Sequence, residues 1–364
     1  ATLLSGYSAA KTKRVYFGTS GSKGIYLADL DTQTGELTTP ELAIEIGRPG
    51  FLAIHPNKPF IYSVAYGKNL GRQGGVAAMK IGDDGILTLL NMKATDGRGG
   101  CHVSLDQTGQ CLMVAYYGSG GVASFKVNED GTLSEAKSYF QHEGSGKHPR
   151  RQQGPHAHSI FPNPANTHAY VPDLGIDEVV IYKLDVANGK LSAAGSAKVP
   201  GGSMGPRHMK FNADGSLAYV LNELDLSVSI YKAIDGGQLE FIKTVSVLPE
   251  GADKTDMTCA EIRIHPNGKF VYTSNRDLTD AGRDSITVFS RFEEGFNRLA
   301  TTPAQVWIPR NFNIDPSGKW MLVGGKKSTN IAIFKIDPQT GLLEFTGTKV
   351  PFDGGPICIQ FLTD

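Results

Sequence analysis

The fold is decided by one stretch of sequence, Gly205-Pro-Arg-His-Met-Lys-Phe-Asn-Ala-Asp-Gly-Ser-Leu-Ala-Tyr-Val-Leu-Asn-Glu-Leu-Asp-Leu-Ser-Val-Ser-Ile-Tyr231. It predicts three short strands, at 209–212, 217–222 and 228–231, joined by a tight turn and a polar turn. The Asp-Gly pair in the first turn is typical of a hairpin, because glycine accepts the positive φ that such turns need. The same pattern recurs along the chain, so its period determines the fold.

The turn after the first strand occurs six times. The six copies begin at His55, Asp106, Asn163, Asn212, His265 and Asp315. Their intervals are 51, 57, 49, 53 and 50 residues, with a mean of 52, so the chain of 364 residues holds seven such units. Repeats of this length, built from short strands and turns, are typical of a β-propeller.

The seventh unit is split between the two ends of the chain. Residues 356–361 look like a first strand with nothing after it, and residues 14–18 and 24–28 look like second and third strands with nothing before them. Joining the two ends completes a blade and leaves no open sheet edge. A fourth strand follows further turns, at 31–35, 83–85, 129–131, 186–189, 235–237 and 337–341. The sequence therefore predicts an all-β fold, a seven-bladed β-propeller with four antiparallel strands per blade, as one domain over residues 1–364.

The composition argues against several kinds of partner. The 36 Lys and Arg residues balance the 36 Asp and Glu residues, so neither a nucleic acid nor a membrane surface is expected to bind through bulk charge. The longest apolar runs are only of strand length, too short to span a bilayer. We expect a monomer. A cytoplasmic location is favoured, and a periplasmic or secreted one would follow if a leader had been removed before Ala1.

The cysteines and histidines give no metal signature. Cys101, Cys111, Cys259 and Cys358 lack the paired spacing of zinc and redox motifs, so we expect four buried free thiols. His156 and His158 could share one side of an extended segment, but no acidic or cysteine partner stands at a fixed spacing from them. We therefore predict neither a metal nor a cofactor.

Strand geometry indicates where a site would lie. The first strand of each blade crosses the sheet and the second returns, so the start of one and the end of the other meet at one face of the disc. The first strand is innermost, so these positions surround one mouth of the central channel. The starts of first strands carry His102, His158, Arg207, His208, Glu261 and Arg310, and the ends of second strands carry Tyr116, Tyr117, Asp173, Asn222, Glu223, Asn275, Arg276, Lys326 and Lys327.

This rim predicts a site for a small anionic molecule. Arginine matches the geometry of a carboxylate or phosphate, and histidine exchanges a proton near neutral pH. The alternative is a wet, polar channel mouth whose charges only pair with one another. A long basic loop at 141–158, with Lys147, Arg150 and Arg151, ends at the same rim. It could cover the channel as a lid, or be a solvated surface loop.

With these residues in place, the chain resembles the seven-bladed β-propeller lactonase family, which includes bacterial 6-phosphogluconolactonases and fungal carboxymuconate lactonising enzymes. The similar segments run in order along the chain, at 101–104, 116–120, 154–159, 172–175, 205–208, 222–223, 260–261, 274–276 and 309–312. The resemblance implies that His158, Arg207, Glu223 and Arg276 are the active residues. His102, His208, Glu261 and Arg310 are expected to be further substrate contacts.

The rim and the resemblance together predict hydrolysis of a small anionic sugar lactone, most simply 6-phosphogluconolactone. Arg207 and Arg276 would hold the phosphate or the ester carbonyl, His158 would deprotonate water and Glu223 would orient its neighbours. Three alternatives stay open: cyclisation of a muconate to a lactone, hydrolysis of another sugar lactone, and a binding scaffold without chemistry. An insertion at 277–284, beside Arg276, is expected to alter which substrate fits.

Overall fold

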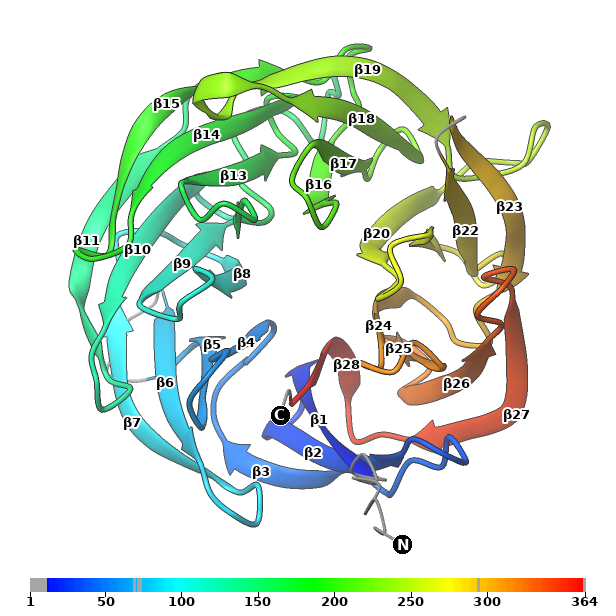
Figure 1. The fold of residues 1–364 in the computed structure, drawn as a ribbon, viewed down its shortest axis with the longest axis horizontal. Coiled ribbons are helices and arrows are strands. Elements are labelled where there is room, and N and C mark those ends of the chain that lie inside the picture. The colour runs from blue at the N-terminus through cyan, green and yellow to red at the C-terminus, as the bar shows by residue number, and fades with distance from the viewer. Residues whose placement is uncertain (1–11, 68–69, 71–73, 293–294, 363–364) are drawn as a thin grey trace, which may run out of the picture.

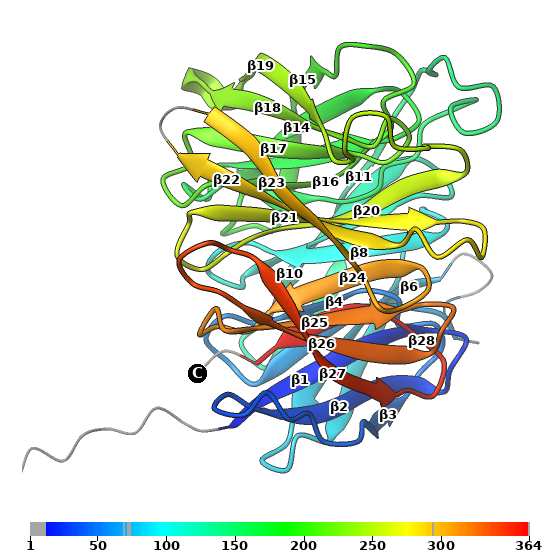
Figure 2. The same cartoon turned by 90° about the vertical axis from the view of Figure 1, so that its right-hand side faces the viewer.

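The computed structural model describes residues 12–67, 70, 74–292 and 295–362. Within these ranges the chain forms seven four-stranded antiparallel sheets, arranged as blades around a central axis (Figure 1). Seen from the side, the ring is a thick disc whose innermost strands run roughly along the axis (Figure 2). The predicted seven-bladed propeller is confirmed.

The blades are each built from an innermost strand at the channel outwards. They consist of β28 (Gly355–Phe361), β1 (Thr12–Ser20), β2 (Gly24–Asp31) and β3 (Glu41–Glu45); β4 (Leu52–Ile54), β5 (Phe60–Ala65), β6 (Gly75–Ile81) and β7 (Leu87–Ala94); β8 (Gly100–Leu105), β9 (Cys111–Tyr116), β10 (Gly121–Val127) and β11 (Leu133–Gln141); β12 (Phe161–Pro162), β13 (His168–Asp173), β14 (Glu178–Asp185) and β15 (Lys190–Lys198); β16 (Pro206–Phe211), β17 (Leu217–Asn222), β18 (Ser227–Ala233) and β19 (Leu239–Ser246); β20 (Met257–Ile264), β21 (Phe270–Asp277), β22 (Ser285–Phe292) and β23 (Gly295–Pro303); β24 (Pro309–Ile314), β25 (Trp320–Gly325), β26 (Asn330–Ile336) and β27 (Leu343–Pro351). A 3₁₀ turn, η2 (Asp235–Gly237), links β18 and β19.

The first and last described strands share one blade, as predicted. Strand β28 pairs antiparallel with β1, which places Phe361 opposite Val15 and Ile359 opposite Phe17. All four side chains are buried in one core with residues of β25 and β26 in the neighbouring blade. The ring is therefore closed by a sheet that covers both the first and the last described strands.

Each strand's sequence matches its depth in the blade. Second and third strands are packed on both faces by neighbouring blades, so β5 and β9 are apolar without alternation and fully buried. The outermost strands are the most exposed, and β11 and β19 have one buried residue between them. First strands face the channel on one side, and β8 and β16 accordingly contain partly exposed and polar residues.

Tyrosine hydroxyls tie neighbouring blades together, and one such bond recurs around the ring. Tyr62 on β5 donates to the carbonyl of Gly131 in the next blade at 3.0 Å, and the same bond recurs from Tyr16 to Gly85 and from Tyr272 to Gly341, both at 2.8 Å. Glycine is required at 131, because its φ is +85° and a Cβ there would lie 2.6 Å from the Phe60 ring. The glycines of the turns that precede the fourth strands thus also form inter-blade contacts.

The four cysteines are free, and Cys111, Cys259 and Cys358 are buried as expected. Cys101 is only half-buried, because it lies near the start of β8 where the channel opens. The prediction of four buried thiols is therefore wrong for Cys101. No helix among the described residues has the length and apolar character that a membrane crossing needs.

Truncating the closing strand should destabilise the whole ring. Ile359 is 0% exposed on β28, so Ile359→Ala should lower the free energy of unfolding by about 2–5 kcal/mol, because it leaves a cavity where the two ends meet. Ile242→Ala on β19 removes the same atoms from a side chain that is 48% exposed, and should cost less than about 0.5 kcal/mol. Urea denaturation checks both values, and equal losses would contradict a closing role for β28.

Candidate functional site

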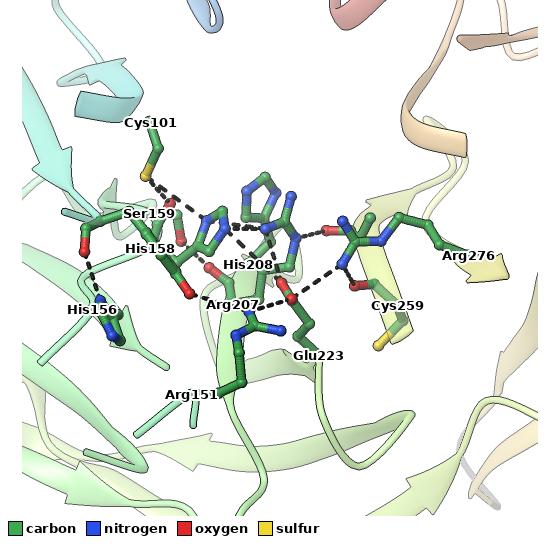
Figure 3. Close-up of polar contacts among 12 residues, drawn as sticks. Cys101, Arg151, His156, His158, Ser159, Arg207, His208, Glu223, Cys259 and Arg276 are labelled. Atoms are coloured by element: carbon green, nitrogen blue, oxygen red, sulfur yellow. Dashed lines mark hydrogen bonds and ion pairs between the residues drawn. The ribbon is translucent and has the colours of Figure 1, made fainter. Parts of the chain in front are cut away.

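The predicted catalytic residues meet at one mouth of the channel, although they come from three blades. His158 lies just before β12, Arg207 is the second residue of β16, Glu223 follows β17 and Arg276 is near the end of β21. Figure 3 shows their side chains converging on Glu223. The antiparallel order of each blade explains this, because strand-one starts and strand-two ends share a face.

Glu223 is the centre of an ion-pair cluster. Its Oε2 accepts a hydrogen bond from Arg207 at 3.0 Å, and its Oε1 lies 2.8 Å from Arg151 and 3.2 Å from Arg276. Glu223 is 4% exposed, and its carboxylate is thus enclosed by three guanidinium groups. Burial by itself would raise the pKa of Glu223, but Arg276, Arg207 and Arg151 outweigh it and hold that pKa far below its usual range.

Backbone carbonyls fix the two central arginines in place. Arg207 Nε donates to the carbonyl of Ala260 at 2.7 Å, and Arg276 donates to the carbonyl of Cys259 at 3.0 Å. Both acceptors belong to β20, the innermost strand of the blade next to the one that contains β16. The guanidinium groups are therefore held by rigid sheet structure and not by mobile loops, as an electrostatic site requires.

His158 is a neutral imidazole in contact with the Arg207 guanidinium. It is 3% exposed, and burial followed by the charges of Arg207, His208 and Arg310 holds its pKa well below 6.5. Its Nε2 contacts the Arg207 guanidinium, and its Nδ1 lies 3.9 Å from the Cys101 sulfur. The neutral imidazole therefore keeps the lone pair of one ring nitrogen at neutral pH, which is the state that a general base needs.

Arg310 differs from Arg151, Arg207 and Arg276, which all pair with Glu223. Among the described residues, no carboxylate lies within ion-pair distance of its guanidinium. Burial lowers the pKa of Arg310, and the charges of Arg207 and Arg276 lower it further. The unfavourable charge on this side chain would be relieved by a bound anion.

Two cavities meet at this group of residues. The larger, of about 440 Å³, opens toward Arg48, Phe51, Cys101 and His208, and the smaller, of about 290 Å³, toward Tyr117, Arg151, Glu223 and Arg276. Both are lined by His158, Arg207 and Arg310. Those three side chains would therefore touch a molecule that spans the two cavities.

The structure brings His208 to the same site but keeps Glu261 and His102 apart from it. His208 lines the larger cavity, and its Nδ1 lies 3.1 Å from Glu261 Oε1. Glu261 lies three residues further along β20 than Thr258, and it lines neither rim cavity. His102 borders a third cavity with Phe161 and lines neither of the other two. Because strand residues step along the channel axis, a rim position read from sequence can lie deeper than its neighbours.

Arg151 is a site residue that the sequence pattern did not single out. It contacts Glu223 and the Tyr117 hydroxyl, the latter at 3.1 Å. The loop at 141–158 folds back to the rim because Asp173 accepts hydrogen bonds from the His142 ring and the His156 amide, both at 2.7 Å. The basic composition and the rim end of this loop were the only signals in the sequence.

The two loop histidines do not converge on a common point. His156 stacks on Tyr117 with 4.5 Å between ring centroids and bonds to its carbonyl through Nδ1, whereas His158 turns toward Arg207. In the part of the chain that the structure describes, no three His, Cys, Asp or Glu side chains are grouped to hold a metal ion.

The insertion at 277–284 also reaches the site. Arg283 binds Asp277 at 3.0 Å and Asp253 at 2.8 Å, which fixes the turn against β20. Leu278 from this turn lines the smaller cavity beside Arg276. This apolar side chain adds to the shape of the site, in line with an effect on which substrate fits.

Comparison with known proteins agrees with this geometry. The family described as "Lactonase, 7-bladed beta-propeller" matches residues 9–361. A 6-phosphogluconolactonase of Bacillus subtilis (strain 168) is 36% identical over 359 residues, covering 95% of this chain and 97% of the relative. A 6-phosphogluconolactonase of Formosa agariphila is 35% identical over 327 residues, covering 88% and 90%.

Solved structures extend the likeness to three dimensions. The structure of a periplasmic gluconolactonase of Pseudomonas aeruginosa superimposes with a TM-score of 0.87 at 25% identity, covering 97% of this chain and 99% of that one. Fold, order of segments and extent of the match all agree over nearly the whole length. The chain belongs to the seven-bladed β-propeller lactonase family.

Proposed function

We propose that this protein hydrolyses a small anionic sugar lactone at the rim site, with 6-phosphogluconolactone as the simplest substrate and 6-phosphogluconate as the product. One observation carries the proposal: four arginines, Arg151, Arg207, Arg276 and Arg310, line one cavity with a single carboxylate, Glu223, which pairs with the first three. The site thus has an excess of positive charge that an anionic substrate would balance. Two relatives that carry the name 6-phosphogluconolactonase support this choice.

Arg207 and Arg276 act on the reacting ester. Water attack on the lactone carbonyl produces a tetrahedral oxyanion, and guanidinium groups already held in place stabilise that charge without further reorganisation. Arg310 and the larger cavity receive the phosphate, because Arg310 has no carboxylate partner of its own among the described residues. The phosphate and the reacting carbonyl are therefore bound by separate cations.

His158 takes the proton from the attacking water. Its Nε2 contacts the Arg207 guanidinium, which places the base beside the cation that holds the reacting carbonyl. Glu223 does not touch the reacting atoms. It is a positioning residue that holds three guanidinium groups together against their mutual repulsion.

A neutral gluconolactone is the second candidate. The Pseudomonas aeruginosa protein of similar structure carries the name gluconolactonase. A neutral sugar would leave the excess charge of the arginines unbalanced, so the phosphorylated lactone suits the site better. Comparing the two substrates in one assay separates the candidates.

Arg310→Gln should reduce activity on the phosphorylated lactone in particular. We expect kcat/KM for 6-phosphogluconolactone to fall about 10- to 100-fold, because a charged hydrogen bond to phosphate is lost, with a smaller effect on glucono-δ-lactone. Initial rates, corrected for uncatalysed opening, measure both. Arg150→Gln changes an exposed arginine of the 141–158 loop and serves as the control. Equal losses on the two substrates would contradict a phosphate contact.

Glu223→Gln should damage both stability and activity. Removing this buried charge leaves Arg151, Arg207 and Arg276 without their shared partner, so the free energy of unfolding at neutral pH should fall by about 3–5 kcal/mol. Chemical denaturation measures this loss, and lactone hydrolysis should fall in parallel. Glu143→Gln, at an exposed position of the same loop, should leave both properties unchanged. A Glu223→Gln protein with wild-type stability and rate would refute the positioning role.

The pH profile tests the state of His158. Its pKa lies well below 6.5, so the neutral base predominates as pH falls through 6.5 and is lost only at lower pH. We therefore expect kcat/KM to show no inflection near pH 6.5, and His158→Gln to lower kcat about 10²- to 10⁴-fold. His168→Gln, on β13 outside the site, is the matched control. An inflection near pH 6.5 that disappears in His158→Gln would contradict a neutral imidazole.

A further inference from the structure

A second cationic cavity lies at the opposite end of the channel. It has a volume of about 260 Å³ and is lined by residues of the innermost strands together with Pro56 and Gln107, which belong to turns on the far face of the disc. The late residues of β16 and β20, Lys210 and Arg263, contribute its cations. None of the four proposed catalytic residues borders it.

Lys210 has an ammonium group without an acceptor. Its Nζ lies 3.9 Å from the centroid of the Phe161 ring, and no hydrogen-bond or ion-pair partner occurs among the described residues. Burial and then the charge of Arg263 lower the pKa of Lys210 to about 7, while Glu261 opposes the shift. An ammonium ion that is held against an aromatic face and near a second cation favours an added anion.

His102 supplies a buried donor that also lacks a partner. Its Nδ1 accepts a hydrogen bond from the Ile160 amide at 3.3 Å, so the ring proton resides on Nε2. That Nε2 is buried, has no hydrogen-bond partner, and belongs to a side chain that is 1% exposed and borders the cavity. A buried donor of this kind is costly unless something accepts its hydrogen.

The nearby carboxylates do not fill this need. Glu261 is shared between His208 at 3.1 Å, Arg263 at 3.5 Å and the Asn311 amide. Arg263 is left with a buried Nε that has no partner. Asp106, at the cavity wall, already accepts four hydrogen bonds from Thr108, Cys111 and Asn166.

We propose that this cavity is a second anion site, in which Lys210, Arg263 and His102 bind a small oxyanion of the size of inorganic phosphate. The three side chains offer donors from three blades and no acceptor, which is the arrangement that a phosphate or sulfate requires. The anion enters from the face opposite the rim. The site is independent of the proposed lactonase reaction, because its cations do not line the rim cavities.

Equilibrium dialysis of the full chain with radiolabelled inorganic phosphate tests this site. The wild type should bind phosphate at the rim, where it competes with the lactone, and at a second site that does not affect hydrolysis. Lys210→Met keeps the length of the side chain without its charge, and should weaken the second site about tenfold or more. Lys210→Arg should retain it, and Lys80→Met, at an exposed position on β6, should bind as the wild type does.

Two results would overturn the proposal. One is phosphate binding that is unchanged in Lys210→Met. The other is a wild type that binds phosphate only where it inhibits lactone hydrolysis, which would mean that the far cavity holds water alone. Circular dichroism and unaltered inhibition of the lactonase by phosphate establish that the Lys210→Met protein is folded and that its rim is intact. Loss of the second site with rim inhibition preserved supports the assignment.

Discussion

The pairing of β28 with β1 holds the ring shut, and the position of every functional side chain depends on it. A four-stranded blade by itself has two hydrophobic faces, and both are covered only when each blade lies between two others. The blade that contains both chain ends lies between β24–β27 and β4–β7 in the closed circle. Closure therefore defines a single axis, around which residues distant in sequence come into contact.

The rim site brings several like charges close together, which is unfavourable in free energy but creates a binding site for an anion. Bringing Arg151, Arg207, Arg276 and Arg310 together is unfavourable, since like charges repel and guanidinium groups lose hydration. Glu223 offsets part of this, and the carbonyls of Cys259 and Ala260 fix two of the arginines. The remaining positive charge is oriented toward the cavities. In the proposed reaction, a site built in this way would stabilise an anion or a developing oxyanion without having to reorganise first.

The channel is polar where the blade interfaces are apolar. Between blades, second and third strands are packed with Val, Ile, Leu and aromatic residues. Along the axis, first strands carry His102, His208, Lys210, Glu261 and Arg263, because side chains there face water or one another and not a neighbouring sheet. The series from His208 through Glu261 to Arg263 connects the two ends of the channel. The two faces of the disc thus differ in chemistry while sharing one set of strands.

The sequence alone determined the architecture and the face that holds the rim site. The 52-residue period, the turn glycines and the split final repeat are local features, and strand order then requires strand-one starts and strand-two ends to meet. Strand order alone therefore predicts that His158, Arg207, Glu223 and Arg276 lie at one mouth of the channel. Tertiary structure decided the rest: Arg151 arrives from a loop that follows no repeat, and His102 and Glu261 lie below the rim. The tertiary structure also determines that Arg310 has no carboxylate partner among the described residues. The sequence repeat fixes only the positions of the backbones, whereas the ion pairs of long charged side chains depend on distances between their charged ends.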